Sequence, residues 1–220
     1  MKLSLLITAQ PINQKRLPAV IRLKIIDEKE KRVAIARQKG FNEARGDIIA
    51  STDADTIPAD DWLKMIDSHF VNNPFSLAVT GSWRFLGKKK FVCAILNIFC
   101  PLVILLDQIV FGSFLGGSNF AVRKSVFNQV GGFNTKLLVY EDVDLSLRLN
   151  KIGKVSREQK IRVSTSARRW EECIVSFKKF KELLLIYIFN FFSQAIYRKP
   201  KFNHFYDIRS KTEVNEQSKD

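Results

Sequence analysis

The chain alternates short apolar runs rich in β-branched residues with segments of helical character, and this alternation limits its fold more than any other feature. Strands are expected over residues 3–8, 20–26, 47–52, 76–81, 118–122 and 161–165, and helices over 33–44, 60–71, 123–130 and 141–150. Strands that alternate with helices predict an α/β fold, in which helices flank a mostly parallel sheet. Ligands of such sheets bind beyond the carboxyl ends of the strands.

Two aspartates, Asp53 and Asp55, follow the apolar run 48–50, where an expected strand ends. Paired carboxylates at a strand end suit a hard divalent cation that keeps open positions for phosphate oxygens. Aspartate is also common in polar turns, so the pair alone leaves both interpretations open.

A second group joins small residues to acidic ones. Gly117, Ser118 and Asn119 lie at the start of an expected strand, and glycine there lets the backbone approach a ligand closely. Glu141 and Asp142 begin an expected helix. A carboxylate at that position could act as a general base on an acceptor hydroxyl, or it could only complement the helix dipole.

A third cluster, Arg168, Arg169 and Trp170, follows the last expected strand. Guanidinium groups suit a diphosphate leaving group, and a solvated basic turn is the alternative.

The formal net charge of +14 favours phosphate-rich partners. Nucleic acid is not expected among them, because the chain has no recognisable reading motif and its aromatic residues lie in apolar runs rather than between basic residues. The three cysteines lack metal-ligand spacing, and their odd number, without a recognisable secretory signal, favours reduced thiols in a cytosolic compartment.

Two apolar segments, 91–111 and 183–197, have basic residues beside them. The first approaches the roughly 20 residues that a membrane span requires, and the second is shorter. Basic flanks suit an interfacial helix on anionic lipid, although both segments could also be core helices. A single crossing at 91–111 would separate Asp53 from Glu141 and Asp142. If one site needs all three, the segment is interfacial, re-entrant or packed in the core, and a monotopic protein at a membrane surface is favoured.

Taken together, the motifs resemble the family 2 glycosyltransferases of the GT-A fold over about residues 20 to 170. The resemblance is carried by 36–40 (ARQKG), 46–49 (GDII), 53–55 (DAD), Pro58, Asp61 with Trp62, 117–121 (GSNFA), 131–133 (GGF), 141–145 (EDVDL) and 166–169 (SARR). It implies a GT-A-like, Rossmann-like sheet and inverting transfer of a sugar from a nucleotide-sugar, linked to UDP or GDP.

On the donor side, the resemblance implies that Asp55 coordinates Mg²⁺ or Mn²⁺ on the donor diphosphate. Asp53 would hold the ribose or join the metal shell, and Arg37 would lie near the nucleotide. Arg168 or Arg169, followed by Trp170, would steady the departing diphosphate.

On the acceptor side, the resemblance implies that Gly117, Ser118 and Asn119 line the sugar and acceptor pocket. Asp142, supported by Glu141, would be the base that deprotonates the acceptor.

The sequence departs from the family pattern in two places. The N-terminal strands that end in Pro-x-Tyr-Asn-Glu-like and Asp-Asp-x-Ser-like motifs and bind the nucleotide base are not visible, so the fold is expected to be N-terminally incomplete. The Gln-x-x-Arg-Trp signature of processive members has Ser166 where the glutamine would be, which favours transfer of a single sugar.

The expected organisation is a glycosyltransferase domain over 1–175, a basic membrane-associated segment over 176–209 and a disordered tail over 210–220. The expected acceptor is a lipid-linked or envelope glycan in polysaccharide biosynthesis. The expected location is the cytoplasmic face of the plasma (inner) membrane, with an anionic membrane surface as a further partner. The alternative is a degenerate or truncated remnant that serves as a membrane-associated binding module.

Overall fold

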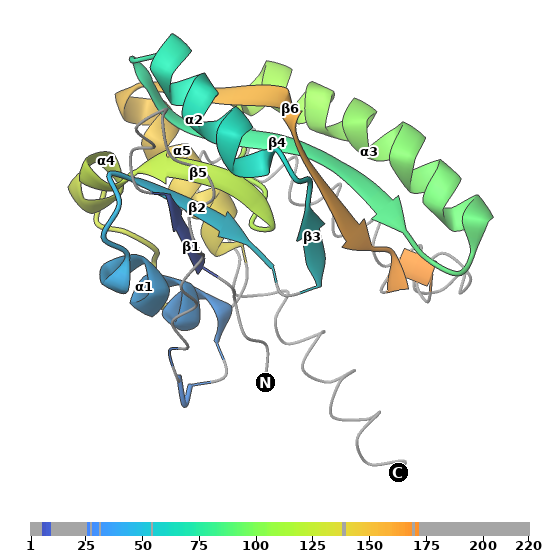
Figure 1. The fold of residues 1–220 in the computed structure, drawn as a ribbon, viewed down its shortest axis with the longest axis horizontal. Helices are drawn as coiled ribbons and strands as arrows, with labels where there is room; N and C mark the ends of the chain where they lie inside the picture. Colours follow the sequence, from blue (N-terminus) through green and yellow to red (C-terminus); the bar gives the residue numbers. More distant parts are fainter. Residues whose placement is uncertain are drawn as a thin grey trace.

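The computed structural model describes residues 6–9, 26, 28–30, 32–53, 55–137, 140–168 and 170–171. Within them a six-stranded sheet has the order β1-β2-β5-β4-β6-β3, with helices packed around it (Figure 1). The strands are β1 (Leu6–Ala9), β2 (Ile48–Thr52), β3 (Thr56–Pro58), β4 (Ser76–Leu86), β5 (Asn119–Arg123) and β6 (Lys154–Ser166). The helices are α1 (Val33–Glu43), α2 (Trp62–Asn72), α3 (Lys90–Phe111), α4 (Lys124–Gln129) and α5 (Glu141–Ile152).

The α/β class is confirmed, but the strand pairing is mixed rather than mostly parallel. Strand β6 pairs with β4 in parallel, whereas β5 lies antiparallel between β2 and β4. The outer strands β1 and β3 also pair antiparallel with their neighbours. Strands β2, β4 and β6 therefore share one direction, and the carboxyl end of β2 meets the amino end of β5, whereas β4 and β6 continue past this level. Thr52 pairs with Asn119 there.

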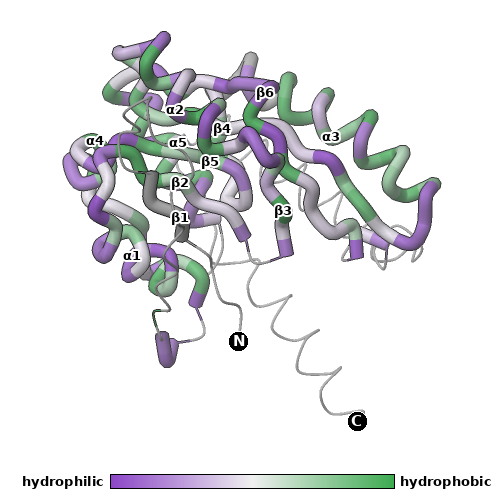
Figure 2. The backbone as a smooth tube through the Cα atoms, viewed as in Figure 1, coloured by the Kyte–Doolittle hydropathy of each residue, from purple (hydrophilic) through white to green (hydrophobic). Residues whose placement is uncertain are grey.

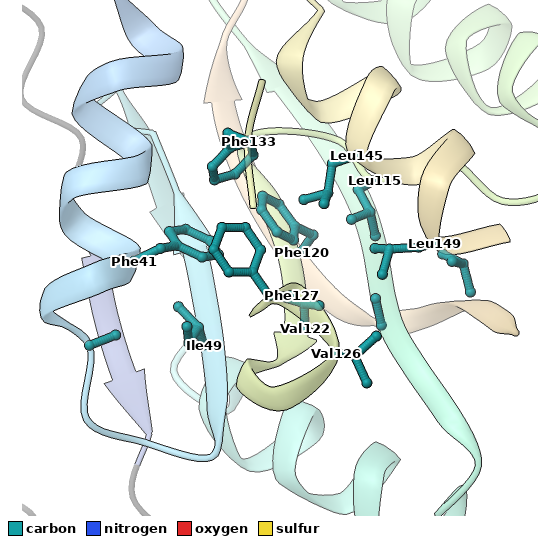
Figure 3. Close-up of a cluster of buried hydrophobic side chains, with 13 residues drawn as sticks. Phe41, Ile49, Leu115, Phe120, Val122, Val126, Phe127, Phe133, Leu145 and Leu149 are labelled. Carbon is teal, nitrogen blue, oxygen red and sulfur yellow. The ribbon is translucent and has the colours of Figure 1, made fainter. Parts of the chain in front are cut away.

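The two faces of the sheet carry separate apolar cores because neighbouring strand residues point to opposite sides. On one face Phe120 packs with Phe41, Phe127 and Phe133, and α1, α4 and α5 cover this core (Figure 3). The Phe41 ring lies 4.7 Å from that of Phe127 and 5.0 Å from that of Phe133. On the other face α2 packs its Trp62 over the sheet. The aromatic residues that are so common in this chain thus hold helices to the strands.

The expected helices match α1, α2, α4 and α5 within two residues at each end. Strands β4 and β6 continue well beyond the expected 76–81 and 161–165, and β3 was not expected, since Pro58 indicated a turn. The expected strand over 20–26 falls almost wholly outside the described residues. The expected segments 176–209 and 210–220 also lie outside them.

Helix α3 spans the apolar segment 91–111. It packs against the part of β4 that continues beyond its pairing with β5. Val92 and Leu96 are buried with Phe85 of β4 and Ala167. The opposite side of the helix is apolar and exposed at Phe91, Ile98, Phe99, Leu102, Leu105 and Leu106, and apolar residues recur along its length (Figure 2). In the described part of the chain, no helix is both long enough and apolar enough to cross a membrane.

Candidate active site

Three elements bring polar residues to the place where β2 ends and β5 begins. Asp53 follows β2, and the loop with Gly117 and Ser118 precedes β5. Glu141 and Asp142 are the first two residues of α5. The mixed pairing allows this, because β5 begins where β2 ends.

The side chain of Arg37, from α1, joins Asp53 after β2 to Glu141 at the start of α5. Its Nη2 lies 2.6 Å from Asp53 Oδ1, and its Nη1 forms an ion pair with Glu141 Oε1. Arg37 is only 5% exposed. A buried guanidinium requires such partners, because desolvating an unpaired charge is costly. Asp53 and Glu141 therefore share one site, which confirms that the intervening segment 91–111 does not separate them.

Arg37 and Glu141 influence each other's protonation. Burial lowers the pKa of Arg37, but the charges of Glu141, Asp53 and Asp142 outweigh it and raise the pKa overall. Burial, together with the neighbouring charge of Asp142, raises the pKa of Glu141 to about 6 in spite of Arg37. The site thus holds three carboxylates around one cation, and burial disfavours the charged form of Glu141.

Asp142 holds the loop before β5. The Gly117 N–H donates to Asp142 Oδ2 at 2.8 Å, and the Val143 N–H donates to Oδ1 at 2.9 Å. Gly117 also packs on Arg37, since a Cβ at this position would lie 2.4 Å from Nη1 of that arginine. The expected loop and base are thus in direct contact, and Gly117 is glycine because the guanidinium occupies the space of a side chain.

Tyr140 caps the start of α5 in the left-handed conformation, with φ of 63°. Among the described residues it is the one non-glycine residue with positive φ. This conformation costs an L-residue about 1 kcal/mol. The strain lies immediately before Glu141 and Asp142, at the point where the chain turns to place both carboxylates.

Asn119 lies beneath the site rather than in it. It is fully buried, and its Oδ1 accepts from Trp62 Nε1 at 2.8 Å. Its Nδ2 donates to the carbonyls of Ser82 and Ile161, both at 3.0 Å. The side-chain amide therefore ties β5 to β4, β6 and α2. Its contacts are those of a positioning residue, whereas the sequence indicated a pocket lining.

Ser118 is half-buried, and its Oγ accepts from Trp83 Nε1 at 2.9 Å. Trp83 was not among the expected site residues. An indole N–H near a strand end was the available signal, because a half-buried tryptophan needs an acceptor for that group. Gly116 lies against the same ring, where a Cβ would come within 2.1 Å of it.

Asp55 is exposed in the turn between β2 and β3, and the side chain of Asp53 is 40% exposed. Among the described residues, no group of three or more His, Cys, Asp or Glu side chains could hold a metal ion. Two open carboxylates nevertheless fit, in donor type, a hard cation whose remaining positions are filled by water and phosphate oxygens.

The C-terminal basic cluster is described only in part. Arg168 is exposed and lines a shallow groove of 380 Å³ with Gly87, Lys88, Lys89, Ser166 and Glu171. Trp170 packs against the Val92 and Leu96 cluster under α3, so the contacts it makes are core contacts. Arg169 lies outside the described residues.

The mixed sheet, its flanking helices and the carboxylates at its edge define the protein class as a GT-A glycosyltransferase fold. The sequence profile of glycosyl transferase family 2 matches residues 8–131, more than half of the chain, and the chain belongs to this family. The fold and family expected from the sequence are thereby confirmed.

Individual known proteins are similar over part of their length. A probable glycosyltransferase, YdaM of Bacillus subtilis, is 28% identical over 146 residues, which are 62% of this chain and 33% of that protein. A glucosyl-dolichyl phosphate glucuronosyltransferase of Haloferax volcanii is 28% identical over 119 residues, 50% of this chain and 36% of that protein. The chain thus spans about a third of the length of these relatives.

Among solved structures, the mannosyltransferase PcManGT from Pyrobaculum calidifontis, in complex with GDP-Man and Mn²⁺, aligns with a TM-score of 0.52. It is 20% identical, and the alignment covers 66% of this chain and 39% of that one. At this identity the likeness concerns the fold.

Proposed function

We propose that this chain transfers a single sugar from a nucleotide-sugar, with inversion, to a lipid-linked or envelope glycan acceptor. The observation that carries the proposal is the contact set of Arg37, which holds Asp53 and Glu141 beside Asp142 and the Gly117 loop. One edge of the sheet thereby offers carboxylates for a donor diphosphate and a carboxylate for an acceptor hydroxyl. The name of the Haloferax relative, a transferase acting on a dolichyl phosphate derivative, supports a lipid-linked acceptor.

On the donor side, Asp53 and Asp55 would hold Mg²⁺ or Mn²⁺. When bound, the cation would neutralise charge that develops on the diphosphate leaving group. Arg37 keeps the Asp53 carboxylate at the strand end through the 2.6 Å contact. Its contribution is positioning, because its own guanidinium is buried rather than open to a nucleotide.

On the acceptor side, Asp142 is the proposed base. Its two oxygens accept from the N–H groups of Gly117 and Val143, and each carboxylate oxygen has a further lone pair for an acceptor hydroxyl. The acceptor oxygen would bond to the anomeric carbon as its proton passes to Asp142. The bond from that carbon to the diphosphate breaks, and its electron pair leaves with the nucleoside diphosphate.

Substitution of the two proposed functional carboxylates tests this mechanism. Sugar transfer from UDP- and GDP-sugars in the presence of Mn²⁺ should fall by at least about a hundredfold in Asp142→Asn, which removes the base at nearly the same size and can still accept from one of the two N–H groups of Gly117 and Val143. Asp55→Ala and chelation of the cation should have a comparable effect. Asp67→Asn, on α2, is a matched control that lies outside the proposed site. Full activity in both Asp142→Asn and Asp55→Ala would refute the mechanism.

Calorimetry with UDP or GDP and Mn²⁺ distinguishes the proposed enzyme from a non-catalytic binding module. The enzyme should bind one nucleotide and lose that affinity in Asp55→Ala, whereas no binding at millimolar nucleotide supports the remnant.

The proposal includes residence at an anionic membrane surface, on the cytoplasmic face of the plasma (inner) membrane. The exposed apolar side of α3 and the preceding Lys88 and Lys89 support it, since apolar and basic groups together suit the lipid interface. Phe91, 75% exposed in the first turn of α3, lies directly after the basic run.

A further inference from the structure

A second hollow lies between α3 and the long strands, beside the candidate active site. It has a volume of 190 Å³ and is lined by residues of β4 (Ser82, Trp83 and Phe85), α3 (Cys100, Pro101 and Ile104) and β6 (Arg157 and Gln159). Its wall toward α3 is apolar, whereas its wall toward β6 carries a cation. This combination is that of a site for an amphipathic anion.

The pairing of β4 with β6 shifts register at this point and forms a bulge. Thr80 pairs with Arg157 and Ser82 with Arg162, so residues 158–161 of β6 face the single residue Gly81 of β4. Ser82 Oγ donates to the Gln159 carbonyl at 2.9 Å, which fixes the bulged segment. A Cβ on Gly81 would lie 1.9 Å from the Ile161 carbonyl oxygen, so glycine is needed where the bulged segment of β6 approaches the β4 backbone closely. Bulges of this kind often re-aim side chains beside functional sites.

The cation in this hollow lacks a counter-charge. Within the described part of the chain, the Arg157 guanidinium makes no ion pair, and its buried Nε has no hydrogen-bond partner. Burial lowers the pKa of Arg157, the direction expected for a cation without a carboxylate beside it. A buried donor without a partner costs about 1–3 kcal/mol, so an anion that accepts from Arg157 would be bound favourably.

Trp83 connects the hollow to the candidate active site. Its ring lines the hollow, and its Nε1 donates to Ser118 Oγ in the loop that Asp142 holds. A ligand here is therefore one side chain away from the proposed acceptor position. Beyond the hollow, α3 continues as an exposed apolar surface at Leu105 and Leu106.

We propose that this hollow binds the phosphate of a lipid phosphate acceptor at Arg157, with the first part of its chain against Phe85, Pro101 and Ile104. The volume admits a headgroup and a short length of chain, and the remaining chain would follow the exposed side of α3. The inference deepens the proposed function and rests on transfer to a lipid-linked acceptor. It names the site and the chemistry that recognise that acceptor.

Binding of farnesyl phosphate to the full chain tests the inference without a transfer reaction. Arg157→Gln should weaken binding by about tenfold or more, as expected for loss of a charge-assisted hydrogen bond. Lys160→Gln, an exposed residue of the same strand with the same loss of charge, should leave it unchanged. Ile104→Trp, which fills the hollow from α3 without changing charge, should also weaken binding.

Two further ligands identify what the site recognises. Farnesol tests the chain alone, and inorganic phosphate tests the anion alone; both should bind at least about tenfold more weakly than farnesyl phosphate, because each lacks one of the two contacts. Cys100 lines the hollow and Cys93 does not, although both belong to α3. Farnesyl phosphate should therefore slow alkylation of Cys100 relative to Cys93, as read by site-resolved mass spectrometry.

Equal affinity of Arg157→Gln and Lys160→Gln would overturn the inference, and so would inorganic phosphate matching farnesyl phosphate in affinity. Calorimetry with nucleotide and Mn²⁺ on the same preparations separates this result from the proposed transfer reaction. Nucleotide binding without farnesyl phosphate binding rejects the lipid site alone, and the reverse pattern rejects the proposed donor site alone.

Discussion

Replacing Glu141 by glutamine should stabilise the folded protein, and the gain should grow with pH. Glutamine copies the shape of the protonated carboxyl and still accepts from Arg37. The pKa of Glu141 is raised from 4.5 to about 6 by burial and by Asp142. A carboxyl with a raised folded pKa stabilises the fold below its unfolded pKa, and that stability is lost as the pH rises through the folded value.

The size of the effect follows from the two pKa values of Glu141. A shift from 4.5 to about 6 corresponds to about 2 kcal/mol of lost stability well above pH 6. At about pH 5 the loss is only about 0.8 kcal/mol, because the carboxyl is then largely protonated in the fold. Glu141→Gln should thus raise the free energy of unfolding by about 2 kcal/mol near pH 8, and by less than half of that near pH 5.

Urea denaturation of both proteins across this pH range, followed by circular dichroism, measures the difference. Glu158→Gln on β6, a half-buried glutamate away from the Arg37 contacts, is the matched control for the loss of one carboxylate. A Glu141→Gln protein that is less stable than the parent near pH 8 would refute the reasoning, since the attraction of Arg37 would then exceed the cost of burial.

Other perturbations have equally definite outcomes. Gly117→Ala should displace the Arg37 guanidinium, which lies 2.4 Å from the added Cβ, and should lower transfer by about tenfold or more. It should also lower the thermal midpoint, because the buried ion pairs of Arg37 are disturbed. Asn119→Ala should lower the free energy of unfolding by about 3 kcal/mol in urea melts, because Trp62 and two carbonyls lose a buried partner. Phe127→Ala should cost about 3–5 kcal/mol in the same assay, since the ring packs among three other phenylalanines. Leu102→Ser, on the exposed side of α3, should reduce flotation with phosphatidylglycerol vesicles without lowering the thermal midpoint; unchanged flotation would contradict a lipid-facing α3.

Local signals in the sequence predicted the parts of the fold that depend on local chemistry. The glycine before β2, the acidic start of α5 and the glycines after α4 mark element ends, and the structure has those ends within two residues. The pair Asp53 and Asp55 was correctly placed at a strand end because the apolar run stops there.

The parts that depend on distant pairing could not be predicted in this way. An isolated strand carries no signal for direction, so the antiparallel insertion of β5 between β2 and β4 was missed. The same holds for the site: Arg37 and Glu141 are 104 residues apart, and nothing near either residue indicates an ion pair. The family resemblance implied that Asn119 lines the pocket, whereas its amide satisfies buried groups from three other elements.

The order of elements along the chain also sets the order in which the protein can assemble during synthesis. Helix α3 is complete at residue 111, whereas the last part of its cover, Ala167 and Trp170, is made more than fifty residues later. Glu141 likewise follows Arg37 by 104 residues. The growing chain therefore presents an incompletely covered apolar helix before Arg37 and Glu141 can meet. Apolar surface that is exposed during synthesis promotes aggregation, so the nascent chain is most prone to aggregate before β6 is made. A lipid surface or a chaperone could cover the helix during this interval.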